Sequence, residues 1–429
     1  MTDYREKMFT ARELEEIRKK FHYVDQDYYG RKRLFFDNAG GSLRLKKAEE
    51  EFHRIDVVPD ASEHSNTLAL ELAALEDRGR EDIKRVIFNA KSGTIYPGYT
   101  ASQIAMEVIR VIMEHAGGTN VVITMLEHPS VFDAARIYSE KYGMELRIAG
   151  VNKKTGGVDA DTILSLVDKN TALLCCMAAS NISGYIYETE NICKRARSVN
   201  PEIFIYVDAV QHAPHGILDP EKWGADVVSF APYKFFGVRG FGLAYLSDRI
   251  STFAHHRLLG KAEDDWEIGS PATAQFAAVT EIINYVAGLG KKAFPEESEE
   301  AGRRKLFEAG MRRIADHERG LLDMMLEGFD DTPGLRHIPG VTVQMDGRDL
   351  STRDLILGIE FLNLSCEQAV AEYEKHGIIA FERALTSIYS RRMVEAFDSN
   401  GMVRLSPLHV NTPAEIRQFL LVTQAIANL

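Results

Sequence analysis

Cysteine and tryptophan are scarce in this chain of 429 residues, which has four cysteines and two tryptophans. Four cysteines are too few for a disulfide framework, and none forms a Cys-x-x-Cys pair that would indicate a structural zinc site. The longest apolar run, residues 171–179, is far below the ~20 residues needed to span a bilayer. The charged N-terminus lacks the apolar segment of a signal peptide. We therefore expect a cytoplasmic protein without a metal site.

Positive charge is also in deficit. The chain has 51 Lys and Arg residues against 63 Asp and Glu residues, which gives a formal net charge of −12. An acidic surface repels phosphate backbones and anionic lipids, so we expect neither nucleic acid nor membrane as a partner. A small anionic ligand would need a local basic pocket. Hydrophobic residues make up 45% of the chain, which is typical of a globular protein and excludes extensive disorder.

Apolar, β-rich runs alternate with helical patterns from about residue 100 to residue 250. Several runs are almost continuously apolar, as expected for strands buried on both faces of a parallel sheet. The alternation predicts a doubly wound α/β fold. The expected strands are residues 120–126, 144–150, 171–178, 203–210, 225–231 and 240–247, and the expected helices between them include 101–116, 130–142 and 188–199.

A charged segment at residues 291–305 follows a long predicted helix at 271–290. It marks the expected domain boundary, although it could also be the solvated start of the next helix. Beyond it the pattern changes to mixed helices and strands. We expect a large α/β domain at residues 31–290, and a small α+β domain made of residues 1–30 and 291–429.

Two sequence stretches combine an aspartate and a lysine that suit cofactor chemistry. Asp208 ends a buried strand in VDAVQ, and Lys234 follows another apolar strand in SFAPYKFFGVRGFG. Open α/β sheets bind ligands at the carboxyl ends of their strands. A desolvated lysine has a lowered pKa that suits Schiff-base formation, and an aspartate can pair with a protonated pyridine nitrogen. The pair indicates pyridoxal phosphate (PLP), against the alternatives of a helix-capping aspartate and a solvated loop lysine.

A phosphate site is expected at residues 92–112. We interpret this stretch as a Gly/Pro turn, followed by Thr100 and an apolar-periodic helix. The backbone N–H groups and dipole of that helix N-terminus would hold a phosphate, helped by the Thr100 hydroxyl. The alternative is an ordinary threonine N-cap.

The order of motifs along the chain resembles the class V aminotransferase family of fold type I PLP-dependent enzymes. The resemblance covers about residues 33–425, and its nearest branches are cysteine desulfurases, isopenicillin N epimerases and kynureninases. It implies a large domain with a doubly wound, mainly parallel sheet, a smaller α+β domain, and a homodimer with shared active sites. The motifs are DNAGGS, GYTAS, LEHPS, SNISG, VDAVQ, PYK, GSP and VRLSPLHVNT.

The resemblance also implies residue roles. Lys234 would bind PLP as a Schiff base and move the substrate proton, Asp208 would bind the pyridine nitrogen, and Arg404 would clamp the substrate α-carboxylate. The remaining implied contacts are Gln211 on the ring-hydroxyl side, Tyr99 and Thr100 in GYTAS with Thr100 at the phosphate, His128 stacked on the ring, Asn181 near the ring hydroxyl and the substrate carboxylate, Tyr233 with its hydroxyl at the phosphate, and Ser270 reaching the phosphate of the partner subunit.

The reaction is less defined than the cofactor. We expect an aminotransferase acting at Cα of a small amino acid. The alternatives are a cysteine desulfurase-like C–S lyase working by β-elimination, an amino-acid epimerase, and, in a different class, a PLP-binding regulatory module without turnover.

The arrangement of cysteines argues against the usual desulfurase route. The loop 381–397, where that route needs a cysteine nucleophile, has none, and Cys366 falls at a predicted helix start, where we expect a buried or capping role. The Tyr233–Lys234 pair is closer to kynureninase. Arg383, Arg391 and Arg392 either line the substrate entrance or are surface charges.

Overall fold

The computed structural model describes residues 4–293 and 302–429. Part of the charged segment expected at the domain boundary, residues 294–301, lies outside the described residues. The division of the chain at residues 30 and 290 stays a prediction. In the described ranges, no helix is both long and apolar enough to cross a bilayer.

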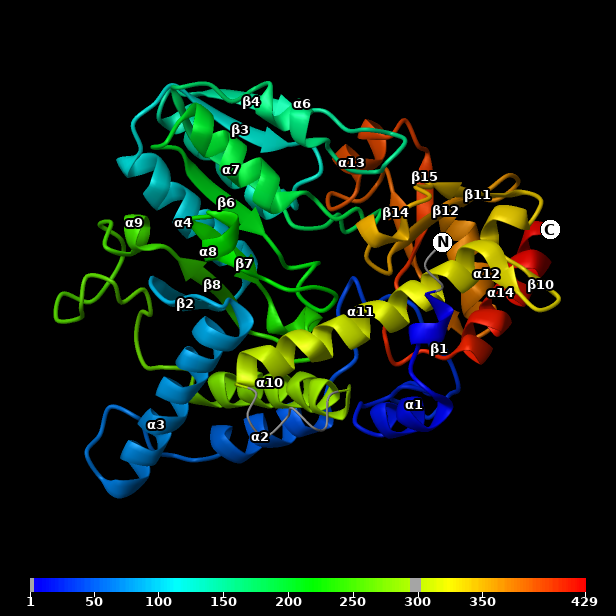
Figure 1. Cartoon of the computed structure of the whole chain (residues 1–429), viewed down its shortest axis with the longest axis horizontal. Coiled ribbons are helices and arrows are strands. Elements are labelled where there is room, and N and C mark those ends of the chain that lie inside the picture. The colour runs from blue at the N-terminus through cyan, green and yellow to red at the C-terminus, as the bar shows by residue number, and fades with distance from the viewer. Residues whose placement is uncertain (1–3, 294–301) are drawn as a thin grey trace.

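A seven-stranded sheet forms the centre of the molecule's larger part (Figure 1). Its order is β2-β8-β7-β6-β5-β3-β4, and all neighbouring pairs are parallel except those that involve β8. The expected mainly parallel sheet is confirmed. The strands are β2 (Thr94–Gly98), β3 (Asn120–Thr124), β4 (Glu145–Ala149), β5 (Thr171–Met177), β6 (Phe204–Asp208), β7 (Val227–Phe230) and β8 (Gly242–Leu246).

Strand β2 corrects the expectation of a Gly/Pro turn ahead of Thr100. Residues 94–98 pair with β8 in antiparallel register, from Thr94 opposite Leu246 to Gly98 opposite Gly242. Proline is tolerated in this strand because β2 lies at the edge of the sheet, where one side of the backbone needs no partner. The composition of the segment therefore resembled a turn, although its place at the sheet edge makes it a strand.

Alternation of side chains along the strands divides the core into two layers. Leu173 and Cys175 of β5 face one cluster, and Leu174 and Cys176 face the other. The first layer is covered by α4 (Ala101–His115) and α5 (Pro129–Lys141), and the second by α6 (Ala160–Leu164), α7 (Thr189–Val199) and α10 (Thr273–Ala293). Both faces of the sheet are buried under helices, as the continuous apolar runs predict.

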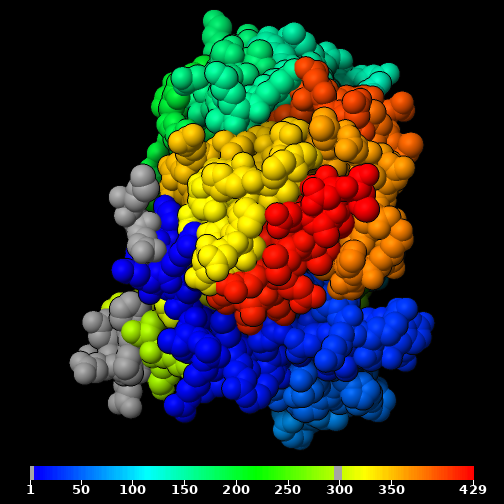
Figure 2. All heavy atoms as spheres, turned by 90° about the vertical axis from the view of Figure 1, so that its right-hand side faces the viewer, coloured from blue at the N-terminus to red at the C-terminus, as the bar shows by residue number. Residues whose placement is uncertain are grey.

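A second, antiparallel sheet has the order β11-β12-β15-β14. The C-terminal helix α14 (Pro413–Ala427) packs beside α11 (Arg303–Glu327) over this part of the chain, as Figure 2 shows in red and yellow. A separate two-stranded pairing joins β1 (Leu34–Phe35) to β13 (Ile378–Ile379). The strands of the sheet are β11 (Val341–Gln344), β12 (Leu357–Phe361), β14 (Phe381–Ala384) and β15 (Gly401–Leu405).

Helix α11 connects the two parts of the structure. Its first half contributes Phe307 and Met311 to the core of the large sheet, and its second half contributes Leu322 and Met325 to the core of the small sheet. Gly310 lets α11 contact α10 closely, because a Cβ at this position would lie 1.9 Å from the carbonyl oxygen of Val286. The two cores therefore share one continuous helix.

The described residues contain further helices and strands. The further ones are α1 (Ala11–Arg18), α2 (Lys46–Asp56), α3 (Thr67–Asp82), α8 (Pro220–Trp223), α9 (Asp248–Ser251), α12 (Cys366–Lys375), α13 (Arg391–Ala396), β9 (Gly328–Phe329) and β10 (Thr332–Pro333).

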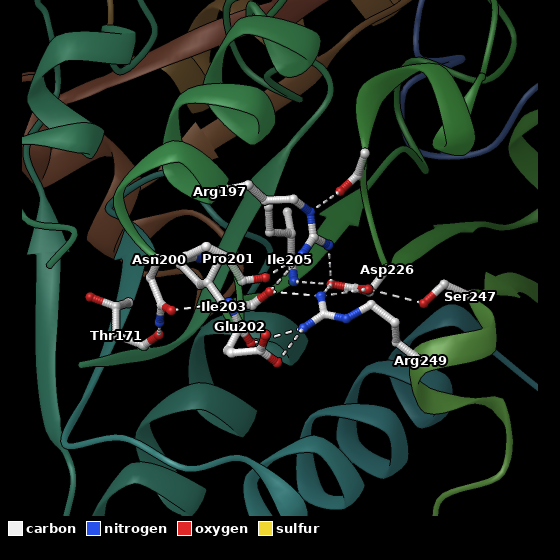
Figure 3. A network of polar contacts seen from close by, with 11 residues as sticks. Thr171, Arg197, Asn200, Pro201, Glu202, Ile203, Ile205, Asp226, Ser247 and Arg249 are labelled. Atoms are coloured by element: carbon white, nitrogen blue, oxygen red, sulfur yellow. Dashed lines mark hydrogen bonds and ion pairs between the residues drawn. The ribbon is translucent and has the colours of Figure 1, made fainter. Parts of the chain in front are cut away.

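The buried side chain of Asp226 connects β6, β7 and β8 by polar contacts at one end of the sheet (Figure 3). The carboxylate of Asp226 pairs with Arg197 at 2.6 Å and with Arg249 at 3.1 Å. It also accepts hydrogen bonds from the backbone N–H of Ile205 and the hydroxyl of Ser247. This buried charge is fully compensated, and it lies just before β7, at the opposite end of the strand from Lys234.

Candidate active site

A cavity of about 380 Å³ lies where β5, β6 and β7 end. Met177 and Asp208 are the last residues of β5 and β6, and a short 3₁₀ turn after β7 ends at Lys234. Ligand sites of open α/β sheets form at this edge. Eight of the ten predicted site residues line this cavity: Tyr99, Thr100, His128, Asn181, Asp208, Gln211, Tyr233 and Lys234.

Lys234 lies in a cationic part of the site. Burial and the positive charges of Arg404 and Arg383 together lower the pKa of Lys234 to about 8, although the carboxylate of Asp208 opposes them. At neutral pH roughly a tenth of the amine is therefore uncharged, which is the form that attacks an aldehyde or accepts a proton.

Asp208 and Gln211 present acceptors to the same cavity. Burial raises the pKa of Asp208, although a hydrogen bond from the backbone N–H of Val210 at 2.9 Å favours its carboxylate. The side-chain oxygen of Gln211 is buried and has no hydrogen-bond partner within the described residues. Both oxygens can accept hydrogen bonds from a polar heterocycle in the cavity.

His128 is the N-cap of helix α5, and a hydrogen bond to the first turn of the helix holds its ring. Its Nδ1 accepts a hydrogen bond from the backbone N–H of Ser130. Burial lowers the pKa of His128 to about 4, assisted by the charges of Lys234, Arg383 and Arg392. The imidazole is therefore neutral at pH 7 and suited to stacking on a flat ring rather than to pairing with an anion.

The N-terminus of α4, where the sequence predicts a phosphate site, also lines the cavity. Thr100 is the N-cap of α4, where its hydroxyl accepts the backbone N–H of Gln103 at 3.0 Å. Arg239, which the sequence analysis did not select, also lines the cavity and lies over the ring of Tyr233 at 4.6 Å. A helix N-terminus beside an arginine favours a phosphate. The position of Arg239 in the GVRGFG loop was the available signal.

Arg404, on β15, does not line the cavity itself but contacts Asn181, which does. Its Nη1 donates to the carbonyl oxygen of Asn181 at 3.2 Å, and its Nη2 pairs with Asp37 at 2.6 Å. Asp37 belongs to the DNAGGS motif, but the sequence analysis assigned it no role. The side-chain oxygen of Asn181 is buried without a hydrogen-bond partner in the described residues and lines the cavity.

Ser270 does not join the other predicted residues. It lines a neighbouring cavity of about 440 Å³, which shares Tyr99, Gly240 and Phe241 with the first. Its predicted contact would in any case lie in a partner subunit, so its role stays a prediction.

The three arginines of uncertain role, Arg383, Arg391 and Arg392, have different environments in the structure. Arg383 is buried on β14, and Arg391 is exposed and pairs with Glu395 at 3.2 Å. Arg392 donates to the carbonyl oxygens of Met125 and Glu127 and thereby supports the segment that carries His128. Arg391 is therefore a surface charge.

The residues of the cavity fit PLP. The unpartnered oxygens of Asn181 and Gln211, the carboxylate of Asp208, the neutral ring of His128 and the amine of Lys234 all border one space, which the N-terminus of α4 also lines. By contrast, no group of three or more metal-binding side chains capable of holding an ion occurs within residues 4–293 and 302–429.

Comparison with known proteins identifies the class. The sequence profile of the class-V aminotransferases matches residues 34–419, so the chain belongs to this family, as the motifs predicted. The expected fold, the expectation of an enzyme and the PLP cofactor are confirmed.

The sequence identity to individual relatives is low. A probable cysteine desulfurase of Streptomyces coelicolor is 26% identical over 79% of this chain and 81% of that protein. An aminotransferase-like protein of Gibberella zeae is 22% identical over 96% of this chain and 98% of its own length. Among solved structures, a cysteine desulfurase from Thermococcus onnurineus superposes with a TM-score of 0.80 at 20% identity, covering 96% of this chain and 98% of that one.

Proposed function

We propose that this protein is a C–S lyase that releases a sulfur leaving group from Cβ of a small amino acid by β-elimination. Several curated relatives are named probable cysteine desulfurases, which favours this alternative over the aminotransferase expected from the sequence. The observation that carries the choice of elimination is the position of Tyr389, whose ring stacks against His128 with centroids 6.2 Å apart. The loop that would deliver a cysteine nucleophile therefore places an aromatic ring at the site.

The chain's own residues support each step. Lys234, with its lowered pKa, accepts the Cα proton, and Arg404 with Asn181 would orient the α-carboxylate. Bound PLP supplies an electron sink for the charge that develops at Cα, and Asp208 would hold its ring nitrogen protonated. The Cβ–S bond breaks with its electron pair on sulfur, which then takes a proton. Water converts the unsaturated amino acid that remains into pyruvate and ammonium.

The cysteines are poorly suited to carry sulfur. Cys366 is the first residue of α12, and burial and the neighbouring Glu367 carboxylate raise its pKa to about 12. Cys175, Cys176 and Cys193 are buried in β5 and α7, and burial raises the pKa of each thiol. Because the thiolate is the nucleophile, a persulfide route is disfavoured.

We also propose a homodimer that closes the neighbouring cavity. Ile268 is exposed and lines the same cavity as Ser270, and Tyr99 is 77% exposed on the wall shared by the two cavities. Such exposed apolar side chains beside an open site are typical of a subunit interface. Ser270 would then face the phosphate of the partner subunit.

The experiment that tests the proposed function is product analysis with L-cysteine and S-methyl-L-cysteine. β-Elimination predicts pyruvate, ammonium and the sulfur product in equal amounts without an α-keto acid, and Cys366→Ser should stay within a few-fold of wild type. Borohydride should fix the visible absorption band onto the peptide that contains Lys234. Alanine with a persulfide on Cys366 would reject the proposal.

Transamination is the second candidate, which the name of the Gibberella zeae relative favours. It predicts keto-acid product only when an α-keto acid acceptor is added, and no release of the sulfur group.

A further inference from the structure

Arg383 is a buried cation without a carboxylate partner. The residue is only 4% exposed, and its Nη2 donates to the carbonyl oxygen of Tyr389 at 3.0 Å. Its Nε is buried and has no hydrogen-bond partner, and no carboxylate lies within ion-pair distance of it in the described parts of the chain. Burying an unpaired guanidinium is costly, so native structures normally supply an anion to such a group.

The neighbouring cations are satisfied by the protein itself. Arg404 pairs with Asp37, and Arg392 binds two backbone carbonyls and lies 3.8 Å from the centre of the Phe132 ring. By comparison, Arg383 has one backbone carbonyl and only distant contact with an aromatic ring, 6.0 Å from the centroid of Phe381. Arg383 therefore has the fewest such contacts of the three arginines, and the Asp37 carboxylate, which pairs with Arg404, acts on it only from beyond ion-pair distance.

Strand pairing places Arg383 beside the proposed carboxylate clamp. Phe381 of β14 lies directly opposite Arg404 of β15, and Arg383 follows Phe381 by two residues. Because side chains alternate along a strand, Phe381, Arg383 and Arg404 share one face of the sheet. The centroid of the Phe381 ring lies 5.0 Å from the Arg404 guanidinium and 6.0 Å from that of Arg383, so the ring is close to both cations.

A second contact connects Arg383 with the cavity. The backbone oxygen that it holds belongs to Tyr389, whose ring stacks on His128, and His128 lines the cavity. The positive charge of Arg383 also lowers the pKa of both His128 and Lys234, so its field reaches the reacting groups. An anion bound by Arg383 would therefore lie on the side of the site that contains His128 and Tyr389.

We propose that Arg383 binds an acidic group on the substrate side chain, so that the substrate is an amino acid with a negatively charged side chain. The inference rests on the proposed function, in which Arg404 binds the α-carboxylate. Two guanidinium groups about one aromatic ring can then hold two anionic groups of one molecule, each by paired N–H donors. For a C–S lyase, the sulfur leaving group would carry the acid.

The test compares two thioethers that differ only in charge. S-Carboxymethyl-L-cysteine carries an acid on its leaving group, and S-carbamoylmethyl-L-cysteine carries the matching neutral amide. Half-saturating concentrations are measured with the PLP-loaded protein, from the change of its visible absorption band and from pyruvate release. L-Glutamate and L-glutamine provide a second pair for the absorption measurement alone. We expect the acid to saturate at a concentration at least tenfold lower than the amide in both pairs.

The variant Arg383→Gln should reduce this preference to less than threefold, and Arg383→Lys should retain an intermediate preference. Arg391→Gln removes an exposed arginine only eight positions away and is the matched control, so it should keep the wild-type preference. The wild-type preference can be measured even if Arg383→Gln does not fold, and its absence would overturn the inference. An unchanged acid-to-amide ratio in a folded Arg383→Gln protein would also overturn it.

Failure of the proposed function gives a different result. A protein that responds to no amino acid of either charge, or that releases no pyruvate from either thioether, contradicts the C–S lyase. Equal responses to acid and amide, with pyruvate formed from both, contradict only the role of Arg383.

Discussion

Arg404 and Asp37 form an ion pair of 2.6 Å between residues that are 367 positions apart in the chain. The guanidinium expected to hold the substrate carboxylate thus already binds a carboxylate of the protein. A substrate would have to displace Asp37 or share Arg404 with it. If Arg404 binds the substrate carboxylate, competition with Asp37 would weaken substrate binding, while the same ion pair stabilises the unliganded site.

Replacing Asp37 should separate these two effects. Asp37→Asn leaves the buried Arg404 without its counter-charge, and we expect a loss of about 3 kcal/mol in the free energy of unfolding of the unliganded protein. Because the competitor is gone, the half-saturating concentration of reactive amino acids should fall at least fivefold. Thermal unfolding and titration of the visible band measure the two quantities. Weaker amino-acid binding in a folded Asp37→Asn protein would mean that Asp37 orients Arg404 instead of competing for it.

Removing the charge of Asp208 should affect turnover much more than cofactor retention. An asparagine amide fits the same space but cannot keep the pyridine nitrogen protonated, so the charge at Cα is no longer stabilised. We expect Asp208→Asn to retain PLP, as judged by its absorption spectrum, and to lose at least 100-fold in the rate of pyruvate formation. Activity within threefold of wild type would instead assign Asp208 to capping the turn at Val210.

Glu127 should make stability depend on pH. Burial raises the pKa of Glu127 to about 8, so the folded protein keeps this side chain protonated at neutral pH, whereas the unfolded chain loses the proton near pH 4.5. The native state therefore binds the extra proton between these values, and stability falls as pH rises, by up to about 1.4 kcal/mol per pH unit. Below pH 4.5 this contribution is fully favourable.

The variant Glu127→Gln replaces the neutral acid with a neutral amide and abolishes the titration. We expect the melting temperature of the variant, relative to wild type, to increase steadily between pH 5 and pH 8. A constant difference over this range would show that Glu127 is already ionised in the folded protein.

Asp226 should be important for stability but not for chemistry. The substitution Asp226→Ala leaves Arg197 and Arg249 without their carboxylate partner. It also removes the hydrogen-bond acceptor of Ile205 and Ser247. Together these losses should lower the free energy of unfolding by about 3–5 kcal/mol. Denaturant unfolding measures this loss. The matched control is Asp161→Ala, because Asp161 pairs with Arg195 but its side chain is 86% exposed, and its loss should cost less than about 1 kcal/mol. Equal effects of the two substitutions would contradict the structural role of Asp226.

Local patterns were sufficient to predict the strands and the reactive pair. Buried parallel strands need continuous apolar runs, so β3 to β8 lie within a few residues of their expected positions. Asp208 and Lys234 each follow such a run, and the geometry of a parallel sheet brings the ends of neighbouring strands β6 and β7 to the same edge. The sequence by itself therefore determined the class of fold, the family and eight of the residues that line the cavity.

Only the tertiary structure decided which charges are paired. The contact between Arg404 and Asp37, the missing partner of Arg383 and the burial of Glu127 depend on segments that are distant in sequence and meet only when the chain is folded. Strand β2 belongs to the same group, since a Gly- and Pro-containing segment becomes a strand through its pairing with β8. Charge pairing and edge-strand formation are long-range properties, because their free energy depends on the partner and the burial that the fold supplies.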